Sequence, residues 1–429
     1  MIQRDRLKVQ ANKSNDSVLW DKYRKSRNKV NSIVRKTKAK YYHDQITANI
    51  GNPHGIWKII NQLKSRKSNV TTINQINFKD TLFSDPTDVS NALNQHFIEI
   101  GPSLASNIPN CSVEFSESTF TFRAISPKDV LDSLNKLSIN KAIGPDNLSS
   151  RLLKEAAPYI SQSLCNLFNK SLNAGTFPSE WKVAKVIPLH KGNSKEDPSN
   201  YRPISILSCV TKLFEKLIYN QLRDYLEDNS ILCDAQSGFR SLHSTATALL
   251  HASNDWLDNI DKGRLLNAVV FLDLAKAFDT VDHSILLRKL EIYGINGVPL
   301  DWFKSYLNHR SQYCYINGQY STESQTLCGV PQGSTLGPLL FLLYINDLPR
   351  SVTYSCPRMY ADDTTLSASG ASTKDIEPKL NSDLANVQLW LEANKLSLNV
   401  FKTEFMLLGS SPGLFSLLKL LKLGLLLVL

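Results

Sequence analysis

Apolar residues recur at helical spacing in several segments of the chain. One helix is predicted to begin at Ser126, because serine caps a first turn, Pro127 suits the first helical position and Asp129 places an acid at the third. An apolar stripe at helical spacing follows this start. The same periodicity predicts further helices over residues 16–68, 86–100, 158–174, 209–229, 283–293, 337–348 and 375–393.

Short apolar and β-branched runs between turn residues predict strands. These runs cover residues 182–190, 267–273, 358–360, 364–366 and 404–408. The run NAVVFLD at 267–273 is typical of a buried strand, and it ends in the acid Asp273. The two runs at 358–360 and 364–366 predict a hairpin with Asp362 and Asp363 at its tip. Helices and strands together indicate an α+β fold.

Charge is distributed unevenly along the chain. The protein has 429 residues, enough for two or three domains, and a net charge of +10. Residues 1–80 contain 18 Lys or Arg against 5 Asp or Glu, and the remainder contains 31 against 34. The basic segment therefore suits a polyanionic partner, although a solvated helical surface would have the same composition.

Cysteine and histidine usage argues against a disulfide scaffold and a zinc site. The seven cysteines are scattered and form no CxxC pair, which favours a reducing compartment, and the eight histidines form no HxxxH pair. The N-terminus lacks the apolar core of a secretory signal. No stretch reaches the roughly 20 apolar residues needed to span a bilayer.

The adjacent acids Asp362 and Asp363 repel each other. One such contact at about 4 Å costs roughly 4 kcal/mol at an effective dielectric of about 20. A solvated turn would relieve this repulsion. If Asp273 lies at the same end of the sheet, three carboxylates converge, and Arg358 is the one cation that the local sequence offers. Such oxygen-rich sites match Mg²⁺, and two ions can activate a 3′-hydroxyl and stabilise a leaving pyrophosphate.

Several motifs resemble those of reverse transcriptases, specifically the LINE-type enzymes of non-LTR retrotransposons. Three resemble successive palm motifs: LDLAKAFDTVDH at 272–283, GVPQGSTLGPLLFLLYINDL at 329–348 and YADD at 360–363. Further matches are NKAIGPD at 140–146, KVIPLHKG at 185–192, SNYRPISIL at 199–207, QSGFR at 236–240 and NKLSLNVFKT at 394–403. The resemblance covers about residues 125–409.

The resemblance implies the fingers and palm of a right-hand polymerase, with a mixed, mainly antiparallel palm sheet packed on helices. The expected organisation is a basic helical nucleic-acid-binding extension (1–80), a loosely ordered connector (81–125), fingers (126–262), a palm with the catalytic acids (263–409) and an aberrant Leu-rich tail (410–429).

Roles for individual residues follow from the resemblance. Asp273 and Asp362 are expected to be the principal metal ligands and Asp363 the third acid, with two Mg²⁺ ions as cofactors and Mn²⁺ as a substitute. The implied catalytic set also includes Lys402, as a general acid for pyrophosphate. The residues expected to contact the incoming nucleotide or the templating base are Lys191, Arg202, Phe278, Gln332, Gly333 and Tyr360.

Simple structural roles compete with several of these assignments. Phe278 would exclude a 2′-hydroxyl and so select deoxynucleotides, but it could also be a plain core residue. Lys191 and Arg202 suit triphosphate binding, and the alternative is ordinary surface charge. Asp279, Asp282 and His283 are expected to cap or orient the following helix rather than catalyse.

The expected partners are an RNA template, a DNA primer or target and deoxynucleoside triphosphates, with no stable membrane partner. Residues expected to contact nucleic acid are Arg24, Arg27, Arg35, Lys36, Lys38, Lys40 and Arg240, where a structural role for Arg240 is equally open. The expected location is intracellular, in the nucleus or cytoplasm, as a ribonucleoprotein.

Two features depart from the family pattern. Residues 1–80 lack the acid and histidine content of an endonuclease, so nicking of a target site is not expected. After Gly409, ten of the nineteen residues from 411 onward are leucine. A frameshift, a premature stop or a gene-model artefact would explain this tail, and a short amphipathic anchor is the rival interpretation.

Three functions therefore compete. The leading one is an RNA-directed DNA polymerase. The second is a non-catalytic nucleic-acid-binding remnant of such an enzyme. The third, an RNA-templated RNA polymerase, would favour a small or polar residue in place of Phe278.

Overall fold

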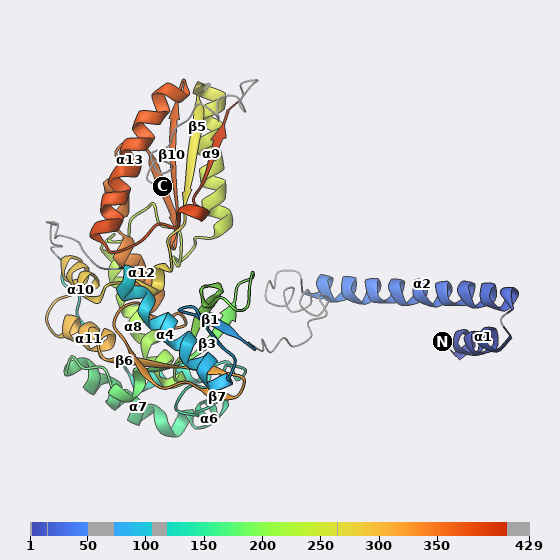
Figure 1. Cartoon of the computed structure of the whole chain (residues 1–429). Helices are drawn as coiled ribbons and strands as arrows, with labels where there is room; N and C mark the ends of the chain where they lie inside the picture. Colours follow the sequence, from blue (N-terminus) through green and yellow to red (C-terminus); the bar gives the residue numbers. More distant parts are fainter. Residues whose placement is uncertain (1, 15, 50–72, 105–117, 264, 410–429) are drawn as a thin grey trace. The chain divides into compact units, whose positions relative to one another are not determined.

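The computed structural model describes residues 2–14, 16–49, 73–104, 118–263 and 265–409 (Figure 1). The chain forms two compact units, Met1–Thr72 and Ile73–Leu429. The first unit ends at residue 72 rather than at the expected 80, because Ile73 and Ile76 are buried in a hydrophobic cluster of the second unit. The Leu-rich tail lies outside the described residues.

The first unit contains two helices, α1 (Ile2–Ser14) and α2 (Ser17–Ala48). The side chain of Asp16 caps α2 by accepting a hydrogen bond from the backbone N–H of Val18 at 2.9 Å. The predicted basic helix is confirmed over this range, and the part of the prediction at 50–68 lies outside the described residues.

One sheet of the second unit, here called the palm sheet, has the strand order β11-β5-β10-β9. All its neighbours are antiparallel. Its strands are β5 (Leu266–Leu272), β9 (Cys356–Tyr360), β10 (Asp363–Gly370) and β11 (Glu404–Leu408). The predicted hairpin of β9 and β10 is confirmed, as is the buried strand β5.

Helices cover both faces of the palm sheet, α13 (Thr373–Ala393) on one side and α9 (Thr245–Gly263) on the other (Figure 1). Along β5, Ala268 and Val270 join the main core with residues of α13, whereas Val269 packs with Trp256 of α9. Successive residues of a strand point to opposite faces, so burial on both faces explains the continuous apolar run.

The second sheet, here called the fingers sheet, has the order β4-β3-β6-β7, with β8 also paired to β6. β3 and β6 are parallel, and the other pairs are antiparallel. The strands are β3 (Val183–His190), β4 (Tyr201–Ile206), β6 (Arg310–Ile316), β7 (Gln319–Tyr320) and β8 (Ser324–Thr326).

The segment expected to be a loose connector is structured in large part. The strands β1 (Ile76–Phe78) and β2 (Thr81–Phe83) form a hairpin, and α4 (Pro86–Leu104) follows it. Val89, Leu93 and Phe97 of α4 are buried together with Val186 and Cys314 of the fingers sheet. The helix predicted at 86–100 is therefore confirmed as α4, whereas the hairpin of β1 and β2 was not predicted, because its few apolar side chains lie among many polar ones.

The remaining helices surround one large core. They are α5 (Pro127–Asn135), α6 (Ser150–Glu155), α7 (Ala157–Asn173), α8 (Cys209–Asp228), α10 (His283–Ile292), α11 (Val298–Leu307) and α12 (Gly337–Ile345). The start predicted at Ser126 is confirmed by a reciprocal capping box with Asp129. α12 is buried on every side, as its apolar composition predicts.

Candidate active site

A cavity of about 880 Å³ lies where the palm sheet meets the fingers sheet. Such a volume falls within the range of small-molecule sites. Charged groups of both signs line it: the acids are Asp273, Asp279 and Asp362, and the cations are Lys191, Arg202, Lys276 and Lys402. Seven of the predicted site residues therefore share this cavity, namely Asp273, Asp362, Lys191, Arg202, Phe278, Gln332 and Lys402.

Asp273 directly follows β5 and is held by the segment that precedes β11. The Asn399 side-chain amide donates to Asp273 Oδ2 at 2.9 Å, and the Asn399 backbone N–H donates to the Asp273 carbonyl at 2.7 Å. Lys402 Nζ lies 3.9 Å from the same carboxylate oxygen, and its side chain is 64% exposed. Asn399 therefore fixes this carboxylate, and Lys402 is a loose neighbour.

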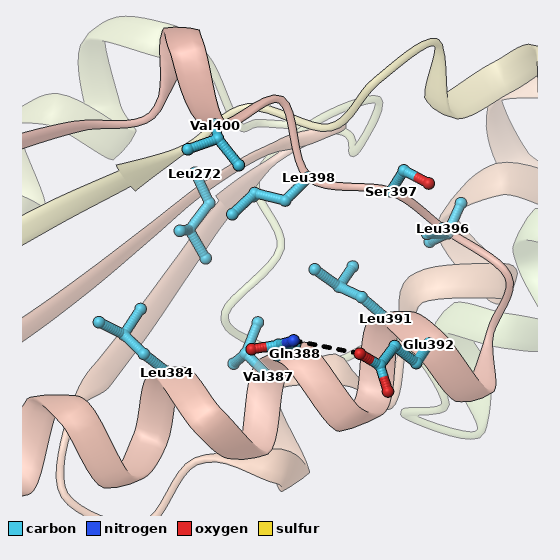
Figure 2. A pocket seen from close by; sticks show the side chains of 10 residues that line it. All are labelled: Leu272, Leu384, Val387, Gln388, Leu391, Glu392, Leu396, Ser397, Leu398 and Val400. Carbon is cyan, nitrogen blue, oxygen red and sulfur yellow. Dashed lines mark hydrogen bonds between the residues drawn. The ribbon is translucent and has the colours of Figure 1, made fainter. Parts of the chain in front are cut away.

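A small apolar pocket of about 250 Å³ explains why this segment holds its position (Figure 2). Leu398 and Val400 face the pocket together with Leu272 at the end of β5. Because successive residues of an extended chain point in opposite directions, this packing directs the intervening Asn399 toward Asp273.

The hairpin tip that carries Asp362 is held by Gln236, whose side chain is buried. Gln236 Oε1 accepts from the backbone N–H groups of Ala361 at 2.9 Å and Gly238 at 2.7 Å, and its amide donates to the Ala361 carbonyl at 3.2 Å. Ala361 has a positive φ of 58°. This left-handed conformation disfavours most residues, so the bonds from Gln236 stabilise a turn that would otherwise be strained.

The three predicted acids do not form one cluster. Among the described residues, no group of three His, Cys, Asp or Glu side chains lies close enough together to hold a metal ion. Asp273 and Asp362 line the same cavity, whereas Asp363 and Tyr360 line a different one of about 790 Å³ beside α9. Asp363 is the first residue of β10 and pairs with Tyr360, whereas Asp362 lies in the turn before the strand, so their side chains line different cavities.

The acids nevertheless influence one another electrostatically. Burial raises the pKa of Asp362 above its usual range, and the carboxylates of Asp363 and Asp273 raise it further. Partial burial also raises the pKa of Asp363, with Asp273 adding to the effect. This mutual repulsion is the property that a bound cation would relieve.

Arg358, the cation nearest to these acids in the sequence, contacts another acid instead. Its guanidinium pairs with Asp255 of α9 and donates to Ser367 Oγ at 3.0 Å. Arg358 lies two residues before Tyr360 on β9, so its side chain points to the α9 face. The cations that share the cavity with the acids come instead from the fingers and from the segment before β11.

Lys191 and Arg202 come from neighbouring strands of the fingers sheet. Lys191 follows β3, and its backbone N–H donates to the Asn200 carbonyl at 2.8 Å. Burial lowers the pKa of Lys191, and the positive charges of Arg202 and Lys402 lower it further. Crowding of cations in one cavity indicates a site for an anion.

Gln332 and Gly333 lie in a turn that is fixed from several sides. The Gln332 side-chain amide donates to both carboxylate oxygens of Asp279, at 2.7 and 2.8 Å. The Gln332 carbonyl accepts from the Ser205 backbone at 2.8 Å. Gly333 has a φ of 132°, and a Cβ there would lie 2.3 Å from the Ser205 carbonyl oxygen, so only glycine fits.

Asp279 is not a helix cap, contrary to the expectation from the sequence. It is the partner of Gln332, and burial raises its pKa to about 6. Asp282 does cap α10, accepting from the backbone N–H groups of Ser284 and Ile285. His283 Nε2 lies 2.8 Å from the Gly329 carbonyl oxygen, so this residue orients the turn of Gln332.

Phe278 and Lys276 also line the cavity. The Phe278 ring stacks on Phe341 of α12, with 4.4 Å between ring centroids, and it also lines the cavity. Burial lowers the pKa of Lys276 to about 8. Its amine lies 3.1 Å from Nε2 of His96 on α4, whose pKa burial lowers to about 4.

Comparison with known proteins agrees with this arrangement. Residues 190–419 match the family described as "Reverse transcriptase (RNA-dependent DNA polymerase)", which is just over half of the chain. The chain belongs to the reverse transcriptase family. The matched range includes all the acids and cations of the cavity.

Curated relatives carry names of the same kind. The chain is 28% identical over 435 residues to the probable RNA-directed DNA polymerase from transposon BS of Drosophila melanogaster, covering 94% of this chain and 46% of that protein. It is 28% identical over 388 residues to the RNA-directed DNA polymerase from mobile element jockey of the same species, covering 86% and 42%. This reverse transcriptase chain therefore spans less than half the length of these relatives.

The predicted nucleic-acid contacts of the reverse transcriptase differ in their surroundings. On α2, Arg24, Arg27, Lys36 and Lys40 are exposed, and the side chains of Arg35 and Lys38 lie outside the described residues. Arg240 instead donates to the carbonyls of Cys233 at 3.0 Å and Gln236 at 3.2 Å. No helix within the described ranges is long and apolar enough to cross a membrane.

Three residues of the site were not assigned these roles from the sequence: Gln236, Asp279 and Asn399. Gln236 and Asn399 lie within motifs that resemble the family, yet their contacts join segments more than 100 positions apart. Asn399 is flanked by the apolar residues Leu398 and Val400, and this signal does not identify a partner; the sequence around Gln236 carries no such signal.

Proposed function

We propose that this reverse transcriptase chain acts as an RNA-directed DNA polymerase of a non-LTR retrotransposon. The observation that supports this proposal is the shared cavity, in which Asp273 and Asp362 face the cations Lys191 and Arg202. A deoxynucleoside triphosphate matches this arrangement of charges. The cations can bind its phosphates, and the carboxylates can bind metal ions beside the phosphate that reacts.

The proposed reaction joins a nucleotide to a primer. The 3′-hydroxyl of the primer gives up its proton to water and its oxygen bonds to the α-phosphorus, while the bond from that phosphorus to the oxygen bridging the α- and β-phosphates breaks and pyrophosphate leaves. Lys191 and Arg202 hold the triphosphate, and Lys402 donates a proton to the leaving pyrophosphate. Its exposure and loose contact with Asp273 leave this lysine able to move.

Two carboxylates fit the way proteins usually bind Mg²⁺, which takes one or two carboxylates together with substrate phosphates and water. Asp273 and Asp362 would hold two such ions, with Mn²⁺ as a substitute, and Asp363 would act from the other side of the turn. When bound, the ions lower the pKa of the attacking hydroxyl and stabilise the charge on the leaving group.

Deoxynucleotide selection is assigned to Phe278. Its ring is held against Phe341 and lines the cavity, so it is rigid enough to exclude a 2′-hydroxyl. The basic helix α2 is assigned to RNA template and DNA target, through exposed residues such as Arg24 and Lys36. The proposed setting is an intracellular ribonucleoprotein, in which the six described cysteines remain free thiols.

Primer extension tests the proposal. A DNA primer annealed to an RNA template is incubated with Mg²⁺ and deoxynucleotides, and the wild type is compared with Asp362→Asn. The matched control is Asp258→Asn, because Asp258 is an exposed acid of α9 whose partner is Lys262. Extension by the wild type and the control, but not by Asp362→Asn, supports the polymerase. Equal product from all three proteins contradicts it and favours a non-catalytic binding protein.

A further inference from the structure

The fingers sheet has one covered face and one open face. α4 covers the first through residues such as Leu93, which is buried with Val186. On the opposite face, Ile187 and Leu189 of β3 are 38% and 51% exposed. Large apolar side chains exposed side by side on a sheet indicate a binding surface.

Three tyrosines extend this open face toward the edge of the sheet. Lys185 pairs in register with Tyr313, and Tyr315 pairs with Tyr320, so these side chains share one face. The Tyr320 ring lies 5.6 Å from that of Tyr313 and 4.7 Å from that of Tyr315, and Tyr320 is 55% exposed. Lys185 Nζ lies 4.0 Å from the centroid of the Tyr315 ring.

The loop that contains the NKAIGPD motif forms the other wall of a groove. This loop is anchored tightly, because a Cβ on Gly144 would lie 2.8 Å from Ser208 Cα and because Ser208 Oγ donates to Asp146 at 2.5 Å. Ile143 is nevertheless 46% exposed. The tyrosine groove, about 340 Å³, is lined by Gly144, Pro145, Asn147, Lys185, Tyr313, Tyr320, Ser321 and Glu323.

We propose that the tyrosine groove binds single-stranded template RNA that has not yet been copied, by stacking bases on Tyr320 and Tyr313 beside Lys185. The inference rests on the proposed polymerase function. The open face continues to the nucleotide cavity, because Leu189 pairs in register with Arg202, which lines that cavity. Template leaving the groove along this face would therefore reach the site of nucleotide addition.

The chemistry of the groove suits an unpaired nucleic acid. Bases of any identity stack on aromatic rings, and a nearby cation contacts the phosphates. Lys185 supplies that cation, and Lys141 is exposed in the adjoining loop. The acid of the groove, Glu323, accepts from Ser311 Oγ at 2.5 Å, which fixes its position but leaves its negative charge in place.

A binding titration tests this inference without requiring catalysis. Fluorescence anisotropy measures the affinity for a DNA primer on an RNA template that either ends flush with the primer or carries an unpaired 5′ extension of eight nucleotides. The extension should strengthen binding to the wild type. Tyr320→Ala should lose about five-fold or more of this gain while keeping its affinity for the flush duplex.

Two further variants sharpen the test. Tyr320→Leu retains apolar bulk without an aromatic ring and should lose the gain as Tyr320→Ala does. Tyr354→Ala removes a palm tyrosine that is 57% exposed and lies outside the groove, and it should keep the whole gain.

The inference is overturned if Tyr320→Ala keeps the gain, or if the substitution changes self-association in sedimentation and leaves RNA binding unaltered. Because no nucleotide is added, the result is independent of chemistry. If primer extension by the enzyme did not depend on Asp362, the polymerase proposal would fail. Tighter binding of the template with the unpaired 5′ segment would still support an RNA-binding groove.

Discussion

Replacement of Gln236 by leucine is expected to disturb the active site from behind the catalytic turn. The substitution removes three hydrogen bonds, two with Ala361 and one with the Gly238 backbone. Ala361 is 7% exposed, so its N–H and carbonyl cannot gain full hydration in exchange. Buried polar groups left unpaired cost about 1–3 kcal/mol each, and the free energy of unfolding should fall by about 3 kcal/mol.

The same substitution should reduce catalysis more than this loss of stability alone explains. Without Gln236, nothing in the described part of the chain bonds to both sides of the strained Ala361 peptide. A displacement of about 1 Å at a reacting group costs about 100-fold in rate, and we expect a reduction of that order in primer extension. The assay is run in Mg²⁺ at a temperature where the variant remains folded.

Gln162→Leu is the matched control for this experiment. Gln162 is an exposed residue of α7 whose amide donates to Asn166 Oδ1 at 3.0 Å. Its replacement should change the unfolding free energy by less than about 0.5 kcal/mol. If folded Gln236→Leu extends primers at the wild-type rate, the turn does not depend on Gln236 and the positioning argument is refuted.

Three further predictions concern charge. Burial raises the pKa of Asp279 from 3.8 to about 6 in the folded protein, so the free energy of unfolding should fall as pH rises through that interval. Relative to Asp279→Asn, the wild type should lose up to about 3 kcal/mol of unfolding free energy across the interval. A difference between the two proteins that does not change with pH would contradict this prediction. Lys289→Met should lower the free energy of unfolding by about 2–4 kcal/mol, because it leaves Asp347 without its buried partner at 2.6 Å. Lys262→Met, which breaks an exposed pair with Asp258, should change the stability measured by thermal denaturation almost not at all. Deleting residues 1–72 should lower the salt slope of RNA binding by at least about 2, and an unchanged slope in a titration would argue against the basic segment.

The core of the palm could be predicted because its residue types match their environment. β5 is apolar except at Asn267 and buried on both faces except at Phe271, and α12 is apolar on every side. The turn between β9 and β10 is followed by the β-branched residues Thr364 and Thr365. In such segments, local pattern and tertiary packing agree, and the predicted boundaries lie close to those of the structure.

The fingers strand β6 was not predicted, for a physical reason. Its buried face consists of Arg310, Gln312, Cys314 and Ile316, and half of these side chains are polar. Gln312 donates to Asn94 Oδ1 of α4 at 3.1 Å, and Arg310 Nη1 donates to the Tyr306 carbonyl at 3.1 Å. Because these polar side chains face the core, they invert the usual alternation, and the pattern alone does not reveal the strand.

The motifs predicted five of the seven charged residues that line the cavity, but not Asp279 or Lys276, and they did not predict how the charged residues are grouped. The motif YADD supplies two adjacent acids, and strand geometry then sends Asp362 and Asp363 to different cavities. The partner of Arg358 also depends on which face of β9 it occupies. Such choices follow from register, and register is set by pairing with residues far away in the chain.

Uncharged amides hold the charged groups of this site, and their neutrality is significant. Asn399 donates to the carboxylate of Asp273, and Gln236 holds the turn before Asp362. A lysine or arginine in place of Asn399 could hold Asp273 as firmly, but its positive charge would compete with any metal ion for the same oxygens. Lys402 is compatible with a metal ion at Asp273, because its side chain is exposed and its amine lies 3.9 Å from the carboxylate oxygen. The amine can therefore move away when a cation binds. The amides thus fix the position of the acids and leave their charge available for cations.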